Sequence, residues 1–303
     1  MLRDYIIRSN HETVEFEGNS SAPVAGGSLS GVPATGAGVS PLSTTHISPF
    51  CEWRSGASLL KVSKAEPAKQ IGGGGRGVVV EFSLASRRRL MQKIACVRRD
   101  ASLPVFVTLT YPDNFPSPKQ SKAHLDTFLK RLKRAIPQAG LIWKLEPQQR
   151  GAPHYHMIVW GCDAKSLKDF VPGAWFDIAG GGDENHLLFH QGKLKNKHCV
   201  SQVRSYKGVM SYASKYLGKT FEVAGWNSLE VGRFWGVVMP GNIPFGEPQT
   251  LYITRIQAVH LMRYQKRFAK LKKRSYPSLT VFCDADQWVT KVIQAEVSEQ
   301  TNK

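Results

Sequence analysis

The chain has 303 residues, of which 42% are hydrophobic, so it can bury the core of one domain with appendages or of two domains. Lys and Arg outnumber Asp and Glu by 41 to 23, and the formal charge of +18 favours a polyanionic partner, nucleic acid first, over an anionic lipid surface or a merely basic soluble protein. The five scattered cysteines argue against a disulfide framework, and the absence of a signal-peptide layout or of an apolar run near the roughly 18 residues of a membrane span predicts a cytoplasmic protein without a membrane partner.

The first quarter of the chain predicts little structure. Residues 19–48 are rich in Gly, Ser, Ala, Pro and Thr and have too few large apolar side chains to offset chain entropy. The run Gly72–Gly75 is interpreted as a flexible linker, because no GK[ST] follows it to form a phosphate-binding loop. We therefore expect residues 1–75 to be largely disordered or weakly structured.

Strands and helices are predicted from there to residue 161. A short strand, a serine cap and a basic helix are expected over residues 78–97. The β-branched run Val105–Tyr111 predicts a strand, and Lys119–Ile136 has the apolar spacing of an amphipathic helix with a basic outer face. Leu141–Glu146 and His154–Gly161 predict two further strands, which the turn-rich PQQRGAP joins as a hairpin.

The pattern is less legible after the hairpin. A short helix is possible at Ser166–Phe170, and a GGGD turn and a mixed segment follow it. Lys207–Lys219 predicts a helix, and Gly232–Met239 predicts a strand. Thr254–Ser275 predicts a second long helix with an apolar stripe amid many Lys and Arg residues.

The hairpin brings possible metal ligands together. Side chains two apart on a strand share a face, so His154 and His156 project together. If Glu146 pairs opposite His154, it joins them on that face, while the other face is apolar and can be buried under helices. We expect the histidine face to lie at the end of an open sheet. Two imidazoles and one carboxylate leave room on a divalent cation for a phosphate oxygen, although an H-x-H pair alone is more often a surface or packed pair.

A second group of possible ligands follows the GGGD turn. It contains Asp183, Glu184, His186 and His190, with helical HxxxH spacing and acidic flanks. Because no strand or helix is predicted to support it, we interpret this group as part of a solvated loop rather than as a metal site.

The helix predicted at Lys207–Lys219 carries two tyrosines one turn apart. Tyr212 and Tyr216 lie side by side, about a quarter to a third of a turn from the apolar stripe, with Lys215 and Lys219 nearby. The stripe itself consists of Tyr206, Val209, Met210, Ala213 and Leu217. Both phenols can reach one phosphate, or both rings can simply cover the edge of the core with their hydroxyls in water.

Tyrosine chemistry on a phosphodiester needs assistance. A phenol with a pKa near 10 is ionised in only about one molecule in a thousand at pH 7, so using its anion costs roughly 4 kcal/mol. A cation held by the hairpin would polarise the phosphate, and Lys215 or Lys219 would stabilise the phenolate or the transition-state oxygens. Attack by Tyr212 or Tyr216 conserves the bond energy in a phosphotyrosine link, so the strand can be rejoined without ATP.

In combination these residues resemble the HUH endonucleases, specifically the two-tyrosine replication initiators of rolling-circle phages and plasmids. The family has an FVTLT-like strand, then a histidine-hydrophobic-histidine strand, then a Y-x-x-x-Y helix, which correspond here to Phe106–Thr110, His154–His156 and Tyr212–Tyr216. Glu146 matches the position of the family's third ligand, and GRFWGV is similar to a segment after the tyrosine helix. The resemblance covers about residues 105–239.

The resemblance implies an α+β fold, with a central antiparallel sheet flanked by helices in an RRM-like arrangement. We assign this HUH nicking and joining domain to residues 76–240, and residues 241–303 to a helical, basic C-terminal extension. The expected metal is Mg²⁺ or Mn²⁺, held by Glu146, His154 and His156, with no small-molecule cofactor. The expected product is a 5′-phosphotyrosine with a free 3′-OH.

The expected partners follow from the same resemblance. They are single-stranded and duplex origin DNA, a host polymerase and, because the chain has no P-loop, a host helicase in a bacterial cytoplasm. We expect Lys144 and Arg150 of the hairpin to contact DNA. The basic C-terminal helix would add phosphate contacts, or would simply be a solvated helix. Its candidate contacts are Arg263, Lys266, Arg267 and Lys270.

Other functions remain compatible with these patterns. In a one-tyrosine HUH transposase or relaxase, either Tyr212 or Tyr216 would be structural. A non-catalytic DNA-binding regulator would account for the charge alone, and a metal phosphodiesterase would use water as its nucleophile. A covalent adduct between protein and DNA distinguishes the first of these from the other two.

Overall fold

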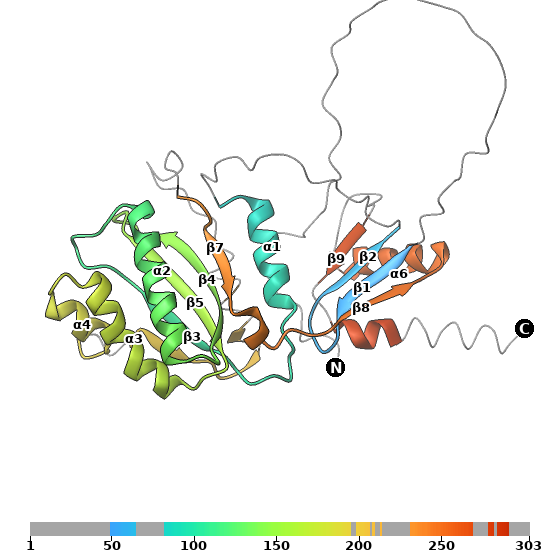
Figure 1. Ribbon diagram of the computed structural model, residues 1–303. Helices are drawn as coiled ribbons and strands as arrows, with labels where there is room; N and C mark the ends of the chain where they lie inside the picture. The colour runs from blue at the N-terminus through green and yellow to red at the C-terminus, as the bar shows by residue number, and fades with distance from the viewer. Residues whose placement is uncertain are drawn as a thin grey trace, which may run out of the picture.

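Two antiparallel sheets with flanking helices make up the computed structural model of this α+β protein (Figure 1). The structure describes residues 49–64, 82–194, 198–206, 208–209, 213, 231–268, 278–281 and 284–290. Within these ranges, no helix is both long and apolar enough to cross a membrane.

The larger sheet has five strands in the order β6-β3-β5-β4-β7. Their bounds are β3 Val105–Leu109, β4 Gly140–Pro147, β5 Pro153–Trp160, β6 Val200–Gln202 and β7 Trp235–Val238. The hairpin β4–β5 lies at the centre, and its register pairs Glu146 with His154 and Lys144 with His156. The predicted hairpin and its parity are therefore confirmed.

One face of this sheet packs against α2 (Pro118–Ala135) and α3 (Ala164–Ala179). Ser117 caps α2, and the hydroxyl of Ser121 lies 2.8 Å from that of Tyr155 on β5. The indole of Trp175 on α3 meets the Tyr155 ring edge-on, with 6.4 Å between the ring centroids. The face that we predicted to be apolar is thus buried under helices, as expected.

The opposite face is more covered than we expected. α1 (Leu84–Ala95), capped by Ser83 as predicted, approaches it, and the Nε1–H of Trp235 on β7 donates to the Ser86 hydroxyl at 2.9 Å. Ile142 and Ile158 on this face are fully buried. Strand parity shows which side chains share a face, but it does not show whether a distant helix covers them. The histidine face is partly open only at the end of the hairpin.

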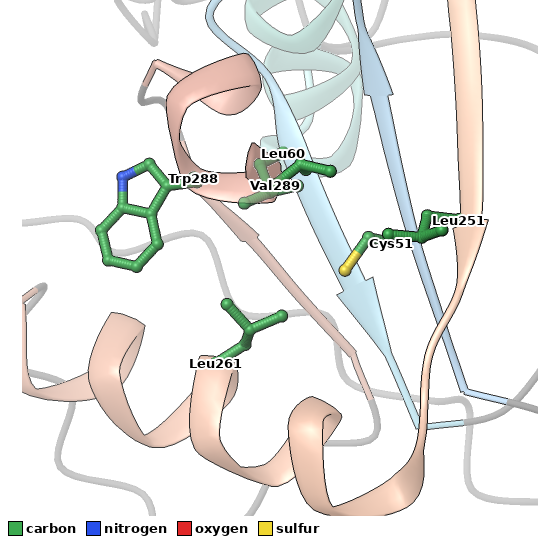
Figure 2. Close-up of a pocket in the computed structure, with 6 residues that line it drawn as sticks. All are labelled: Cys51, Leu60, Leu251, Leu261, Trp288 and Val289. Atoms are coloured by element: carbon green, nitrogen blue, oxygen red, sulfur yellow. The ribbon is translucent and has the colours of Figure 1, made fainter. Parts of the chain in front are cut away.

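A smaller sheet has the order β8-β1-β2-β9. Its strands are β1 Phe50–Arg54, β2 Leu60–Ser63, β8 Pro248–Tyr252 and β9 Ser278–Val281. α6 (Arg255–Phe268) and the helical segment 285–290 pack on one side of it. Figure 2 shows the apolar side chains that meet there, which are Cys51, Leu60, Leu251, Leu261, Trp288 and Val289.

This smaller sheet corrects two expectations. β1 and β2 lie inside residues 1–75, which we expected to be largely disordered or weakly structured, and β8 and β9 lie inside the extension that we expected to be helical. The four strands have only four or five residues each, and β8 and β9 lie far along the chain from β1 and β2. A local pattern of hydrophobicity carries no signal for such distant pairing.

The turn between β1 and β2 joins the small sheet to the rest of the molecule. The Ser58 N–H donates to the carbonyl of Ala95 at the end of α1, and the Arg99 N–H donates to the carbonyl of Gly56, both at 2.9 Å. The Arg99 guanidinium also forms a 2.9 Å ion pair with Asp284. A short 3-10 helix, η2 (Pro240–Asn242), precedes β8 on the return path.

Candidate functional site

Glu146, His154 and His156 lie together at one end of the β4–β5 hairpin. The Nε2 of His156 is 3.8 Å from the Oε2 of Glu146, and the two imidazole centroids are 4.6 Å apart. The side chain of Glu146 is 13% exposed and that of His156 is 6% exposed. The register predicted from parity therefore places the carboxylate beside both imidazoles, at the point where the sheet face is partly open.

Lys144 brings a positive charge to the same carboxylate. Its Nζ lies 3.5 Å from Glu146 Oε2 and 4.7 Å from the ring centroid of Phe82, and its side chain is fully buried. We expected this lysine to contact DNA. In the structure its ammonium faces the interior, so its direct effect is on the charge of the site.

Burial controls the protonation of His154. It lowers the pKa of the imidazole to about 4, and the nearby positive charge of Arg150 acts in the same direction. The ring is therefore neutral at pH 7 and retains one lone pair. Its Nδ1 lies 3.3 Å from the Nε2 of Gln148, a residue of the hairpin turn.

The donor set fits a divalent cation in chemical type. Two atoms that each lie about 2.1 Å from one cation are at most about 4.2 Å apart, and the Glu146–His156 separation of 3.8 Å falls within that span. Among the described residues, no three His, Cys, Asp or Glu side chains already form a closed metal-binding group. Glu146 and His156 thus converge, while His154 is engaged with Gln148.

Arg150 was also expected to contact DNA. Its Nη1 donates to the carboxylate of Asp113 and to the carbonyl of Pro112, both at 2.9 Å, and its Nη2 donates to the carbonyl of Tyr111 at 2.5 Å. Its Nε–H donates to Gln148 Oε1 at 2.9 Å. The guanidinium therefore ties the hairpin turn to the segment that follows β3.

The segment that we interpreted as a solvated loop is a helix, α4 (Glu184–His190), which begins at the cap Asp183. His186 and His190 are 5% and 1% exposed, so this interpretation was wrong. His190 Nε2 accepts from the backbone N–H of Thr110 at 3.3 Å, and His186 Nε2 donates to the Thr110 carbonyl at 2.9 Å. The aspartate cap before an HxxxH spacing was the available signal for this helix.

Burial also lowers the pKa of His190 to about 4, and the charges of His186, His154 and His198 contribute to the shift. His154 acts on His190 in this way because α4 lies beside the hairpin. Thr110 follows Leu109, which pairs with Tyr155, so the residue held by α4 is at the same end of the sheet as the candidate site.

The two candidate nucleophiles, Tyr212 and Tyr216, and the lysines Lys215 and Lys219 lie outside the described residues. Two described members of the predicted core stripe, Val209 and Ala213, are 1% and 0% exposed. The apolar side of the tyrosine helix is thus buried where the structure describes it.

The predicted DNA contacts on α6 are described in part. Arg263 is exposed and Lys266 is half-buried. The side chain of Arg267 and the whole of Lys270 lie outside the described residues. Arg255, at the start of the same helix, is also exposed and adds a cation that we had not singled out.

A comparison with family models matches residues 104–221 to the family of replication-associated proteins of the ORF2 and gene 2 protein type. The matched range contains β3, the hairpin, α4 and both tyrosines, and it excludes the small sheet. No curated protein and no solved structure matches the chain. The family match supports an association of this chain with the initiation of DNA replication.

Proposed function

We propose that this protein initiates rolling-circle DNA replication by nicking single-stranded origin DNA with a tyrosine. The observation that carries this proposal is the β4–β5 register, which brings Glu146 beside His154 and His156 at the partly open end of the sheet. The family match over the same residues supports it independently. The proposal makes the protein a metal-dependent endonuclease and strand transferase.

Each chemical role falls on a residue of this chain. Glu146, His154 and His156 would hold Mg²⁺ or Mn²⁺, which would polarise the scissile phosphate when bound. The phenol oxygen of Tyr212 or Tyr216 forms a bond to phosphorus as the bond to the 3′ oxygen breaks, which leaves a 5′-phosphotyrosine and a free 3′-OH. The ammonium of Lys215 or Lys219 would stabilise the negative charge that develops.

The second tyrosine would end the round of replication. It attacks the regenerated junction, and the free 3′-OH then attacks the first phosphotyrosine, so each broken phosphodiester is replaced and the strand is rejoined. Host polymerase and helicase would act on the exposed end in a bacterial cytoplasm. In the alternative, a one-tyrosine transposase or relaxase, only one of Tyr212 and Tyr216 reacts.

The test uses a labelled single-stranded origin oligonucleotide with Mn²⁺ and a denaturing gel. We expect a covalent adduct with the wild-type chain and with each of Tyr212→Phe and Tyr216→Phe, and no adduct with the double variant. Tyr206→Phe is the matched control, because the Tyr206 hydroxyl lies 3.4 Å from both Ser58 Oγ and the Val97 carbonyl. Loss of the adduct in one single variant alone favours the one-tyrosine alternative.

Complete absence of an adduct with the wild-type chain, across a broad set of oligonucleotides, would favour a non-catalytic DNA-binding regulator. Cleavage without an adduct would favour water as the nucleophile. The metal site is tested in the same assay with His156→Ala, which we expect to abolish the adduct. The control is His260→Ala on α6, an exposed histidine remote from the hairpin.

A further inference from the structure

The turn between β4 and β5 contains a hydrogen-bonded chain that ends on His154. The Nε2 of Gln148 lies 3.3 Å from His154 Nδ1, and its Oε1 accepts from Arg150 Nε at 2.9 Å. The backbone fixes Gln148 as well, because its N–H donates to the Ala152 carbonyl at 2.9 Å and its carbonyl accepts from the Gly151 N–H at 2.8 Å. The amide of Gln148 is therefore held from both sides.

Arg150 is anchored more firmly than its place in a surface turn would suggest. Its two terminal nitrogens donate to the Asp113 carboxylate and to the carbonyls of Pro112 and Tyr111. The guanidinium also lies over the ring of Phe115, 5.3 Å from its centroid. These contacts fix the plane of the guanidinium, and its Nε–H must then point at Gln148.

The sense of the Gln148 amide follows from this geometry. A guanidinium can only donate hydrogen bonds, so the amide oxygen must face Arg150 and the NH₂ group must face His154. The Nδ1 of His154 is then the acceptor. In the neutral ring the single proton is on Nε2, the nitrogen that points away from the turn.

We propose that Gln148, oriented by Arg150, is a positioning residue that holds the His154 ring with its proton on Nε2 and thereby weakens the binding of a divalent cation at the hairpin. The statement about the ring stands on geometry alone, whereas the statement about the cation rests on the proposed function. A cation can bind His154 Nε2 only if the proton moves to Nδ1, where the NH₂ group of Gln148 is the wrong partner.

Gln148→Glu reverses this preference with a change of one atom type. A carboxylate at position 148 accepts both from Arg150 Nε–H and from a His154 Nδ1–H, which frees the lone pair on Nε2. Metal-bound histidines usually donate their other N–H to such a carboxylate, and partners of this kind change metal affinity by about 10- to 100-fold. We therefore expect Gln148→Glu to bind Mn²⁺ at least about tenfold more tightly than the wild-type chain.

The first measurement is long-range ¹H–¹⁵N NMR of the full chain labelled at histidine and free of metal. His154→Ala assigns the resonances of the ring. We expect the Nε2–H form in the wild-type chain, the Nδ1–H form in Gln148→Glu, and a mixture of the two in Arg150→Lys, because lysine cannot fix the amide. Gln138→Glu is the matched control, since Gln138 is exposed just before the opposite end of β4.

The second measurement is a Mn²⁺ titration of the same proteins followed by electron paramagnetic resonance. Tighter binding in Gln148→Glu, with no change in Gln138→Glu, supports the proposal. A wild-type ring already protonated on Nδ1, or a ring unchanged by Gln148→Glu, overturns it. If the ring behaves as expected but no protein binds Mn²⁺, the role of Gln148 on the ring stands and both the effect on the cation and the proposed metal site fail.

Discussion

Thr110 donates its backbone N–H to Nε2 of His190 over 3.3 Å, and this contact joins the end of β3 to α4. The carbonyl of Thr110 accepts from Trp175 Nε1 at 2.6 Å and from His186 Nε2 at 2.9 Å. Thr110 is itself buried, so its backbone groups need these partners in place of water. Three aromatic side chains from α3 and α4 thus hold the strand that borders the metal-site hairpin.

Removing the acceptor at position 190 should destabilise the protein. His190→Leu leaves the buried Thr110 N–H without its partner, which costs about 1–3 kcal/mol. His190→Gln keeps an oxygen where Nε2 accepts, so we expect a smaller loss of the free energy of unfolding. Urea denaturation of both variants measures the difference. Equal losses would show that cavity formation, rather than the hydrogen bond, governs this position.

Stability should fall in acid because His190 is buried in its neutral form. Its pKa is about 4 in the folded protein and near 6.5 in the unfolded chain, so the unfolded chain binds more protons between these values. The free energy of unfolding therefore falls by roughly 3 kcal/mol for this one group as the pH is lowered from 6.5 to 4. His190→Gln should flatten that slope in urea titrations at pH 7 and pH 4.5. Parallel pH profiles for the two proteins would contradict the assignment.

The buried ammonium of Lys144 should oppose cation binding at Glu146. At 3.5 Å from the carboxylate oxygen it repels any second positive charge held there, by a few kcal/mol at an effective dielectric constant of about 20. We expect Lys144→Met to bind Mn²⁺ about tenfold or more tightly in calorimetry, and Lys144→Arg to resemble the wild-type chain. An affinity that is unchanged by the loss of the charge would refute this electrostatic role.

α6 should contribute phosphate contacts to DNA binding. Arg255 and Arg263 are both exposed on it. Removing one cation that binds a phosphate lowers the slope of log Kd against log salt by about one, so the double change Arg255→Gln with Arg263→Gln should lower it by about two. Fluorescence anisotropy at several salt concentrations measures the slope. Lys133→Gln, on an exposed position of α2, should leave it unchanged. Equal slopes in all three proteins would mean that α6 is a solvated helix.

The predictable part of the site was set by short-range geometry. The two-residue period of a strand placed His154 and His156 on one face, and a hairpin turn of ordinary length put Glu146 opposite His154. Both relationships are determined by residues that are close in sequence. They were therefore available without any knowledge of the rest of the fold.

The parts that were missed depend on distant contacts. Lys144 was taken for a DNA contact because lysines are usually exposed, whereas Phe82 and α1 cover it from a remote part of the chain. Arg150 was taken for a DNA contact for the same reason, yet its acceptors follow β3. His186 and His190 looked solvated because their partner, Thr110, lies on another strand.

The smaller sheet also constrains the order in which the molecule can assemble. The ribosome makes β1 and β2 early, but β8, the strand that covers the free edge of β1, begins only at Pro248, and β9, which covers β2, begins at Ser278. During synthesis both edges of the β1–β2 hairpin must therefore wait, open to other strands, until nearly the whole chain has emerged. The hairpin of the candidate site closes between neighbouring residues and does not share this delay.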